Sequence, residues 1–238
     1  MTLLTMQTGD RFVATSAEIF QRYGITLEVG YDFEVYRDLL KEARPDHILG
    51  APFDPQIHEL TVENALWIVG RNVDGVIVHT QAVRMLDMNG MSVGEYFTQR
   101  FREFPPSGVD LDLKRSRFRA GPTAKRMRGT CAYQGEFWIA PGEASLRGQG
   151  MCCVLSRYAF YQTVQHWDPD YMMAFMVKAL VFKGFAEKSG YMHTQPGALR
   201  WFLKGNDVPV EGFLSYMGRE DLHYVLDLPL QDLVALAA

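Results

Sequence analysis

Cysteine is scarce in this sequence, and the way the three cysteines are spaced excludes two common uses of the residue. Cys131, Cys152 and Cys153 give neither the even set of a disulfide framework nor the paired Cys-x-x-Cys pattern of a zinc site. We therefore expect that the thiols are free, that no metal is bound and that the protein lies in a reducing, cytoplasmic compartment.

Long apolar runs, a leader and an excess of basic charge are missing as well. The most apolar stretch, 171–182, is interrupted by Lys178 and is shorter than the roughly 18 residues that suggest a membrane span. The first residues lack a basic segment followed by an apolar one, so we expect no signal peptide and no membrane span. The net charge of −4 argues against nucleic acid as the main partner, because such domains are basic.

What is present is the composition of a folded protein. The 238 residues are 47% hydrophobic and 22% charged, which is typical of a globular chain with a sizeable core. Hydrophobic periodicity and turn residues predict helices at 33–43, 92–104, 150–167 and 178–189, strands at 65–69, 75–85, 131–139 and 171–177, and a hairpin of 210–217 with 222–228. This order predicts an α/β (α+β) fold in one domain spanning 1–238.

The strand expected at 131–139 carries a lone carboxylate. Strict alternation places Cys131, Tyr133, Phe137 and Ile139 on one face, with Gln134, Glu136 and Trp138 on the other. Glu136 is the candidate general base, and its alternative is a solvated residue paired with Arg or Lys. His79, on a preceding strand, is a weaker candidate base and is better explained as a core histidine bonded to a carbonyl.

A glycine-rich turn is the sharpest local feature. The segment Leu146-Arg147-Gly148-Gln149-Gly150-Met151-Cys152 follows a strand and opens a helix, where unpaired N–H groups and the helix dipole favour phosphate. One alternative is a tight turn without a ligand. Another is a dinucleotide fold with Asp168 or Asp170 as the acidic partner, although Cys153 stands at its third glycine position.

Three motifs in order resemble the GNAT superfamily of N-acetyltransferases. Arg147-Gly148-Gln149-Gly150-Met151-Cys152 is similar to its cofactor signature of Gln or Arg, two free positions, Gly, one free position and Gly or Ala. Phe137-Trp138-Ile139-Ala140-Pro141 resembles the end of its fourth strand, and Glu187-Lys188-Ser189-Gly190-Tyr191 the end of its next helix. Cys152 replaces the usual small residue, and Ala186 stands where the family often has a tyrosine acid.

The resemblance implies an acyl-CoA N-acyltransferase fold, with a mixed, mostly antiparallel sheet that splays at the fourth strand. Acetyl-CoA or another acyl-CoA would be the acyl donor, and a small-molecule amine or amino acid the acceptor. The backbone of Arg147, Gly148, Gln149, Gly150, Met151 and Cys152 would hold the pyrophosphate. Main-chain groups of Phe137 and Ile139 would pair with the pantetheine, Glu136 would act as base, and Tyr191 is a candidate acid.

Other roles stay open beside this one. Seven of the 24 basic residues lie between Lys114 and Arg128, inside a helical and basic insertion at about 87–128. This segment suits an acidic partner such as acyl carrier protein, the 3′-phosphate of the coenzyme, RNA, or solvent. Arg84-Met85-Leu86 and Gly90 to Phe97 loosely resemble acyl-homoserine-lactone and N-acyl amino acid synthases. A non-catalytic acyl-CoA-binding module and a homodimer are further alternatives.

Overall fold

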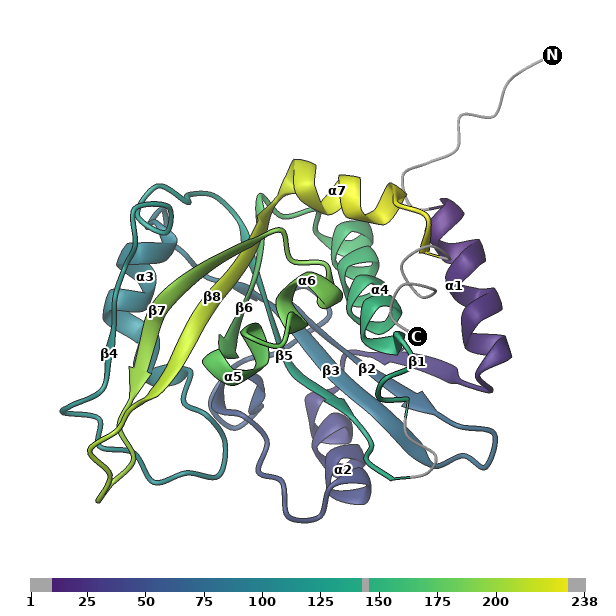
Figure 1. Cartoon of the computed structure of the whole chain (residues 1–238), viewed down its shortest axis with the longest axis horizontal. Helices are drawn as coiled ribbons and strands as arrows, with labels where there is room; N and C mark the ends of the chain where they lie inside the picture. Colours follow the sequence, from purple (N-terminus) through teal and green to yellow (C-terminus); the bar gives the residue numbers. More distant parts are fainter. Residues whose placement is uncertain (1–9, 143–145, 231–238) are drawn as a thin grey trace.

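One mixed sheet of eight strands organises the chain in the computed structural model, which describes residues 10–142 and 146–230. The strand order is β1-β2-β3-β5-β6-β8-β7-β4 (Figure 1). The strands are β1 (Thr26–Gly30), β2 (Ala65–Arg71), β3 (Ile77–Leu86), β4 (Arg117–Phe118), β5 (Cys131–Ile139), β6 (Tyr171–Val177), β7 (His193–Trp201) and β8 (Val210–Gly218). The predicted α/β class is confirmed.

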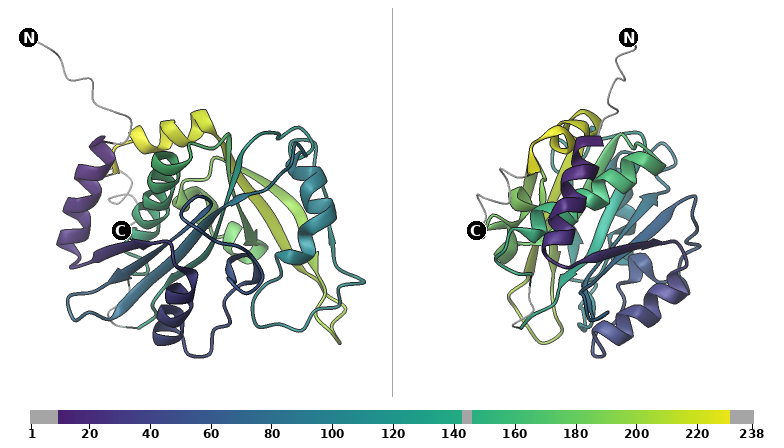
Figure 2. Two further views of the ribbon diagram at one scale, coloured as in Figure 1. Left: turned by 180° about the vertical axis from the view of Figure 1, so that it is seen from behind. Right: turned by 90° about the vertical axis from the view of Figure 1, so that its right-hand side faces the viewer.

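Helices cover both faces of this sheet (Figure 2). They are α1 (Asp10–Arg22), α2 (Phe33–Ala43), η1 (Ala51–Phe53), α3 (Val93–Arg100), η2 (Phe101–Glu103), α4 (Met151–His166), α5 (Lys178–Val181), α6 (Phe185–Ser189) and α7 (Arg219–Asp227). Apolar residues of α1, α4 and α7 form the core on one face, and those of α2 and α3 form the core on the other. No helix within the described residues is long and apolar enough to cross a membrane.

The only parallel strand pair in the described sheet is also a short one. β5 and β6 pair from Cys131–Tyr133 to Tyr171–Met173, and no pairing follows beyond these three residues on each strand. β6 continues in register with β8 as far as Val177, and β5 continues along β3 as far as Ile139. The sheet therefore opens between β5 and β6, as the resemblance predicted.

A bulge in β5 corrects the predicted strand faces. Thr80 pairs with Trp138 and Ala82 with Gly135, so Gln81 of β3 stands opposite two residues, Glu136 and Phe137. Glu136 has a left-handed φ of 54°. The extra residue reverses the alternation. Cys131 and Tyr133 thus pack in the α2/α3 core while Ile139 and Phe137 pack in the α4 core, so the prediction that all four share a face is wrong.

Two further predicted elements are wrong. The helix expected at 178–189 is divided into α5 and α6, because Gly184 adopts a left-handed φ of 72° between them. The hairpin expected across 218–221 is instead the start of α7, since Asp221 Oδ2 accepts the N–H of Gly218 as a helix cap at 2.9 Å. β8 pairs with β7, a strand that the sequence pattern did not indicate.

The segment at about 87–128 reaches the far edge of the sheet. Ser92 caps α3 by a reciprocal hydrogen-bond pair with Glu95, which explains the helix start predicted there. Further along, β4 pairs with β7 through Arg117–Arg200 and Phe118–Leu199. The inserted residues are thus part of the same sheet.

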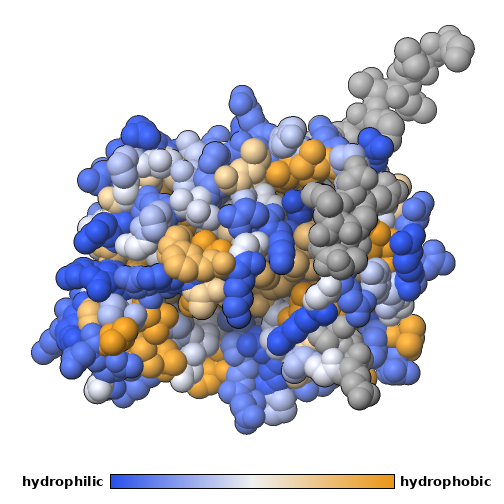
Figure 3. Space-filling model, in the orientation of Figure 1, coloured by the Kyte–Doolittle hydropathy of each residue, from blue (hydrophilic) through white to orange (hydrophobic). Residues whose placement is uncertain are grey.

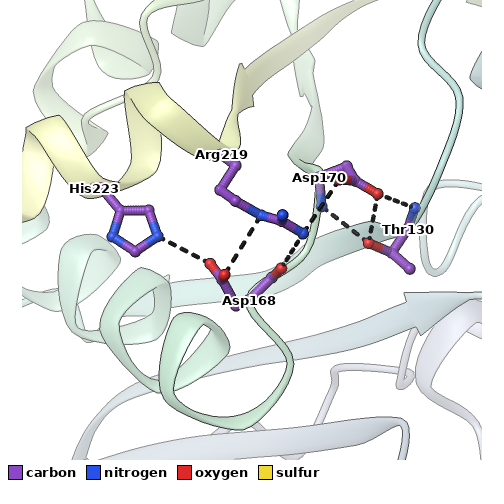
Figure 4. A network of polar contacts seen from close by, with 5 residues as sticks. All are labelled: Thr130, Asp168, Asp170, Arg219 and His223. Atoms are coloured by element: carbon purple, nitrogen blue, oxygen red, sulfur yellow. Dashed lines mark hydrogen bonds and ion pairs between the residues drawn. The ribbon is translucent and has the colours of Figure 1, made fainter.

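The closed end of the β5–β6 pair is fastened by a polar cluster (Figure 4). Asp170 Oδ2, just before β6, accepts the backbone N–H of Thr130 at 2.8 Å, and Thr130 directly precedes β5. Arg219, the first residue of α7, contacts Asp170 at 3.2 Å and Asp168 at 3.4 Å. Asp168 Oδ1 also lies 2.9 Å from Nε2 of His223. Three neighbouring strands are tied together at this end, opposite the opening.

Candidate functional site

Two cavities occupy the opening between β5 and β6. The first, of about 440 Å³, contains the glycine turn and is called the turn cavity here. The second, of about 480 Å³, contains the bulge of β5 and is called the bulge cavity. Phe137, Leu180 and Phe185 line both. The two cavities therefore meet at the point where β5 passes its bulge.

The glycine turn has the backbone that anion binding requires. Gly148 and Gly150 have φ values of 79° and 73°, a left-handed backbone conformation that residues other than glycine rarely adopt. Gly150 is the N-cap of the 16-residue helix α4. Cys153 donates its N–H to the Gly150 carbonyl at 2.9 Å, and the N–H groups before it in the first turn have no helical acceptor four residues back. Lys183 and Lys188 line the same cavity and add positive charge. The turn cavity suits a diphosphate group.

The residues predicted around this turn come together as expected. Arg147, Gly148, Gly150, Met151 and Cys152 line the turn cavity with Phe137 and Ile139. Gln149 lies in the turn itself, where its N–H reaches the carbonyl of Leu146 at 3.4 Å.

The backbone of Ile139 points away from β3. Ala140 donates its N–H to Val78 at 2.9 Å, so the alternation of an antiparallel ladder turns the N–H and C=O of Ile139 toward the opposite edge. The Ile139 carbonyl accepts Nε of Arg147 there at 2.9 Å, which ties the strand to the glycine turn. The Ile139 N–H lies on the edge that faces the opening.

Glu136 extends from the bulge into a set of three donors. Its Oε2 lies 2.6 Å from His47 Nε2 and 3.5 Å from Arg44 Nη1, and its Oε1 accepts the N–H of Gly50 at 2.9 Å. The side chain is only 7% exposed, so the alternative of a solvated residue is wrong, although the pairing with an Arg that it included is present in Arg44. The carboxylate lines the bulge cavity, as do its three partners.

Arg44 fixes the tautomer of His47. Arg44 Nη2 lies 2.7 Å from His47 Nδ1, and because a guanidinium only donates, Nδ1 accepts and carries no proton. Nε2 then bears the proton and donates to Glu136. The turn after α2 positions both side chains, with the N–H of His47 bonded to the carbonyl of Arg44. Sequence reasoning missed Arg44 and His47, because only the tertiary fold brings them to β5.

Tyr191 lies elsewhere than the other predicted site residues. It is 2% exposed and lines neither cavity. Its hydroxyl donates to Gln134 Oε1 at 2.9 Å, and Gln134 is a wall of the bulge cavity. Burial raises the pKa of Tyr191 well above its usual value. The residue therefore contacts the site through Gln134.

His79 behaves as a core histidine. Its Nδ1 lies 2.7 Å from the carbonyl of Trp138, and the ring packs edge-on against Phe137 at 5.0 Å between centroids. Complete burial lowers the pKa of His79 to about 3, so the ring is neutral at physiological pH. The alternative of a carbonyl-bonded core residue is confirmed.

Two further observations concern metal-binding side chains and the surface near the site. The described residues contain no group of three His, Cys, Asp or Glu side chains that could hold a metal ion. Figure 3 shows apolar surface near the centre of the face seen in Figure 1, and α5 and the loop after it have Leu180 and Phe182 exposed at 43% and 71%.

Comparisons with known proteins give matches among solved structures. No family model matches the sequence, and no curated protein matches it. The FeeM N-acyl amino acid synthase from uncultured soil microbes is 9% identical with a TM-score of 0.48, over 83% of this chain and 92% of that chain. Spermidine N-acetyltransferase from Vibrio cholerae, in complex with CoA and spermine, is 12% identical with a TM-score of 0.43, over 84% and 98%. Ribosomal-protein-S5-alanine acetyltransferase from Vibrio fischeri is 10% identical with a TM-score of 0.44, over 84% and 95%.

The features of the chain itself decide the fold. The mixed, mostly antiparallel sheet, its opening between β5 and β6 and the glycine turn before α4 are those expected from the motifs. The chain has the GNAT fold. The predicted fold is thus confirmed, while the cofactor-binding and catalytic roles of the residues in the two cavities stay predictions.

Proposed function

We propose that this protein is a GNAT-type N-acyltransferase that moves an acyl group from coenzyme A to a small primary amine by direct attack. The observation that carries the proposal is the meeting of the turn cavity and the bulge cavity at Phe137, Leu180 and Phe185. A donor bound at the glycine turn and an acceptor beside Glu136 would react at this junction. The whole chain would act as one domain, because the inserted β4 completes the same sheet.

The turn cavity would bind the acyl donor. The N–H groups of the glycine turn and the first turn of α4 would bind the pyrophosphate, with Lys183 and Lys188 close to the charge. The pantetheine arm would then lie along the edge of β5 that β6 leaves unpaired. Main-chain groups of Phe137 and Ile139 lie on that path, so the arm adds a short strand to the opened sheet.

The bulge cavity would hold the amine. The amine nitrogen attacks the thioester carbonyl, the new C–N bond forms, and the coenzyme thiolate leaves. Glu136 takes the proton of the amine, directly or through water, and the N–H of Ile139 stabilises the oxyanion. Arg44, His47 and Gly50 hold the Glu136 carboxylate in place.

The length of the acyl chain is a second question for the same site. Ala174, Met176, Val177 and Leu180 give the bulge cavity an apolar wall. This lining supports the alternative of a longer acyl chain, delivered by coenzyme A or by acyl carrier protein. A series of acyl-CoA donors from acetyl to long-chain distinguishes the two.

Thermal unfolding with coenzyme A and acetyl-CoA tests donor binding. A ligand at about 100 times its dissociation constant stabilises by about 2.7 kcal/mol, which raises the midpoint by several degrees. Gly150→Glu should abolish the shift, because it places a side chain and a negative charge in the left-handed turn. Gly75→Glu is the matched control, since Gly75 has a φ of 79° in a hairpin with open space around it.

Turnover separates an enzyme from a binding module. Release of free thiol from acetyl-CoA in the presence of small amines supports transfer. Binding of coenzyme A without turnover of any amine or donor would support the non-catalytic alternative instead. Equal shifts in wild type and Gly150→Glu would show that the glycine turn is not the donor site.

A further inference from the structure

The bulge cavity passes through the opening of the sheet, so it has one half on each face. Tyr133 in its wall belongs to the α2/α3 core, while Met176 belongs to the α4 core. Glu136 lies in the half on the α2 side, because its partner His47 follows α2. The proposed base and its donors therefore account for one half of the cavity, and the half on the α4 side has no role in the transfer step.

Polar side chains form part of the wall on the α4 side. Gln134 on β5, Ser156 on α4 and Ser189 at the end of α6 are all buried and line this cavity. Their neighbours are apolar residues of the α4 core. Because a polar group buried among apolar ones costs free energy unless it is hydrogen-bonded, each of these three side chains needs a partner.

The hydrogen bonds of Gln134 leave the proton of Ser156 available. Gln134 Nε2 donates to Gln81 Oε1 at 2.9 Å and to Ser156 Oγ at 3.3 Å. Gln134 Oε1 accepts the hydroxyl of Tyr191 at 2.9 Å. Ser156 thus accepts from Gln134, and its own hydroxyl lies 3.5 Å from Gln134 Oε1, which is too long for a strong hydrogen bond.

The hydroxyl of Ser189 has no hydrogen-bond partner within the described residues, although only 1% of Ser189 is exposed. Ser215 on β8 is also buried with an unpartnered hydroxyl, but it lines neither of the two cavities. Ser189 differs from Ser215 because it borders a space of about 480 Å³ that can hold a ligand. A bound group in this space can supply the partner that Ser189 lacks.

Both cavity serines lie one helical turn beyond the path of the proposed donor. Ser156 follows Cys152 of the turn cavity by four residues on α4. Ser189 follows Phe185, where the two cavities meet, by four residues on α6. Residues four apart share a helix face and are separated by about 6 Å along the axis. The acyl end of a donor that enters through the turn cavity therefore reaches the two serines.

The charges around this cavity select the kind of group that the serines would bind. Among the described residues that line it, the charged side chains are Arg44 and Glu136, which lie 3.5 Å from each other on the α2 side. A carboxylate beside the serines would be buried without a cation, whereas a neutral oxygen can accept from both hydroxyls.

We propose that Ser156 and Ser189 form a subsite for a hydroxyl or keto oxygen on the acyl chain, so that the donor carries an oxygen-substituted acyl group. The amine approaches from the half of the cavity that contains Glu136. This inference rests on the proposed function, because it takes the turn cavity as the coenzyme A site.

Calorimetric titration of the full chain, without any amine, tests the subsite. The probes are coenzyme A, butyryl-CoA, acetoacetyl-CoA and the two enantiomers of 3-hydroxybutyryl-CoA. We expect an oxygen-bearing ester to bind about five- to tenfold more tightly than butyryl-CoA, because it adds hydrogen bonds to buried hydroxyls. In Ser189→Ala and in Ser156→Ala this gain should fall below about twofold, while the affinity for coenzyme A stays unchanged.

Ser215→Ala is the matched control, because it removes a buried, unpartnered hydroxyl that borders neither cavity. It should retain the full gain, and circular dichroism checks that each variant folds. Equal loss of the gain in Ser215→Ala and Ser189→Ala would show an effect of packing and overturn the subsite.

The remaining outcomes separate the subsite from the donor site. Equal binding of butyryl-CoA and every oxygen-bearing ester by the wild type would overturn the subsite and leave the donor site in place. A gain that persists in both Ser189→Ala and Ser156→Ala would assign the acyl oxygen to other residues. If neither coenzyme A nor any ester bound, the proposed donor site would be refuted, and the acyl subsite with it.

Discussion

His47 Nε2 lies 2.6 Å from Glu136 Oε2, although 89 residues separate them in the chain. The contact joins the turn after α2 to the bulge of β5, and Arg44 determines which nitrogen of the ring donates. The proposed base is thereby held at one position in the bulge cavity.

Replacing this carboxylate should remove proton transfer while leaving the donor site intact. Glu136→Gln keeps the size of the side chain and loses the base, so kcat/KM should fall by about 10²- to 10⁴-fold. The dissociation constant of coenzyme A should stay unchanged. Steady-state kinetics and a binding titration measure the two quantities. Full activity in Glu136→Gln would assign the base to another group.

The close approach of Gly50 to Glu136 makes a second, milder test. A Cβ at Gly50 would lie 2.6 Å from Glu136 Oε1, while its φ of −62° suits any residue. Gly50→Ala should therefore displace the carboxylate without backbone strain, and we expect kcat to fall about tenfold. Gly218→Ala is the control, because it also has a negative φ and its nearest contact is 3.7 Å away. Equal rates in both variants would make the Gly50 contact dispensable.

Burial of His79 should make stability depend on pH. The pKa of His79 falls from 6.5 to about 3 in the folded chain because the ring is fully buried. Between these values only the unfolded chain takes up the proton, so wild type loses about 1.4 kcal/mol per pH unit from this group as pH falls below 6.5. His79→Asn keeps a donor for the Trp138 carbonyl and lacks this dependence.

Urea unfolding of both proteins between pH 4 and 7 measures that difference. The gap between the two free energies of unfolding should narrow or reverse toward acid pH. Parallel curves over this range would mean that His79 is accessible to protons in the folded state.

The cluster at the closed end of the β5–β6 pair should respond to pH in its own way. The backbone N–H of Thr130 lowers the pKa of Asp170, so its contribution to stability is present above the usual value of 3.8 and is lost as pH falls further. Asp170→Asn should lower the unfolding temperature by about 2–4 °C at neutral pH and by less in acid. Asp74→Asn, in the β2–β3 hairpin, serves as the control. The same loss in both variants would remove any special role from Asp170.

The sequence predicts the elements of this fold better than it predicts the contacts between them. The bounds of β5 and β6 follow from local pattern and turn residues, and they agree with the structure at both ends. The bulge does not follow from the local pattern, because the left-handed φ of Glu136 arises from the pairing of β5 with β3. The sequence pattern does not predict β7, because Pro196 and Gly197 interrupt its apolar residues. The register of β7 with β8 also shifts at that point.

In the candidate site, too, the residues with a local sequence signature were predicted, and the residues that only the tertiary fold brings together were not. Its glycine turn is continuous in sequence and carries a local signature, so its residues were found together. Arg44 and His47 follow a helix 89 or more residues before Glu136, and no local pattern marks them. Gly218 with Asp221 gives a turn signal that a hairpin and a helix cap share, and only packing against the α4 core selects the helix.

The cluster around Arg219 connects α7 to the closed end of the β5–β6 pair, although no residue of α7 lines either cavity. Thr130, Asp170 and Arg219 begin or precede β5, β6 and α7. β5 and β6 diverge from this end of the sheet. The angle between the two strands therefore depends on the contacts of Thr130, Asp170 and Arg219 that hold this end together. We therefore expect a change at Arg219 to alter the opening between the two strands while every lining residue stays the same.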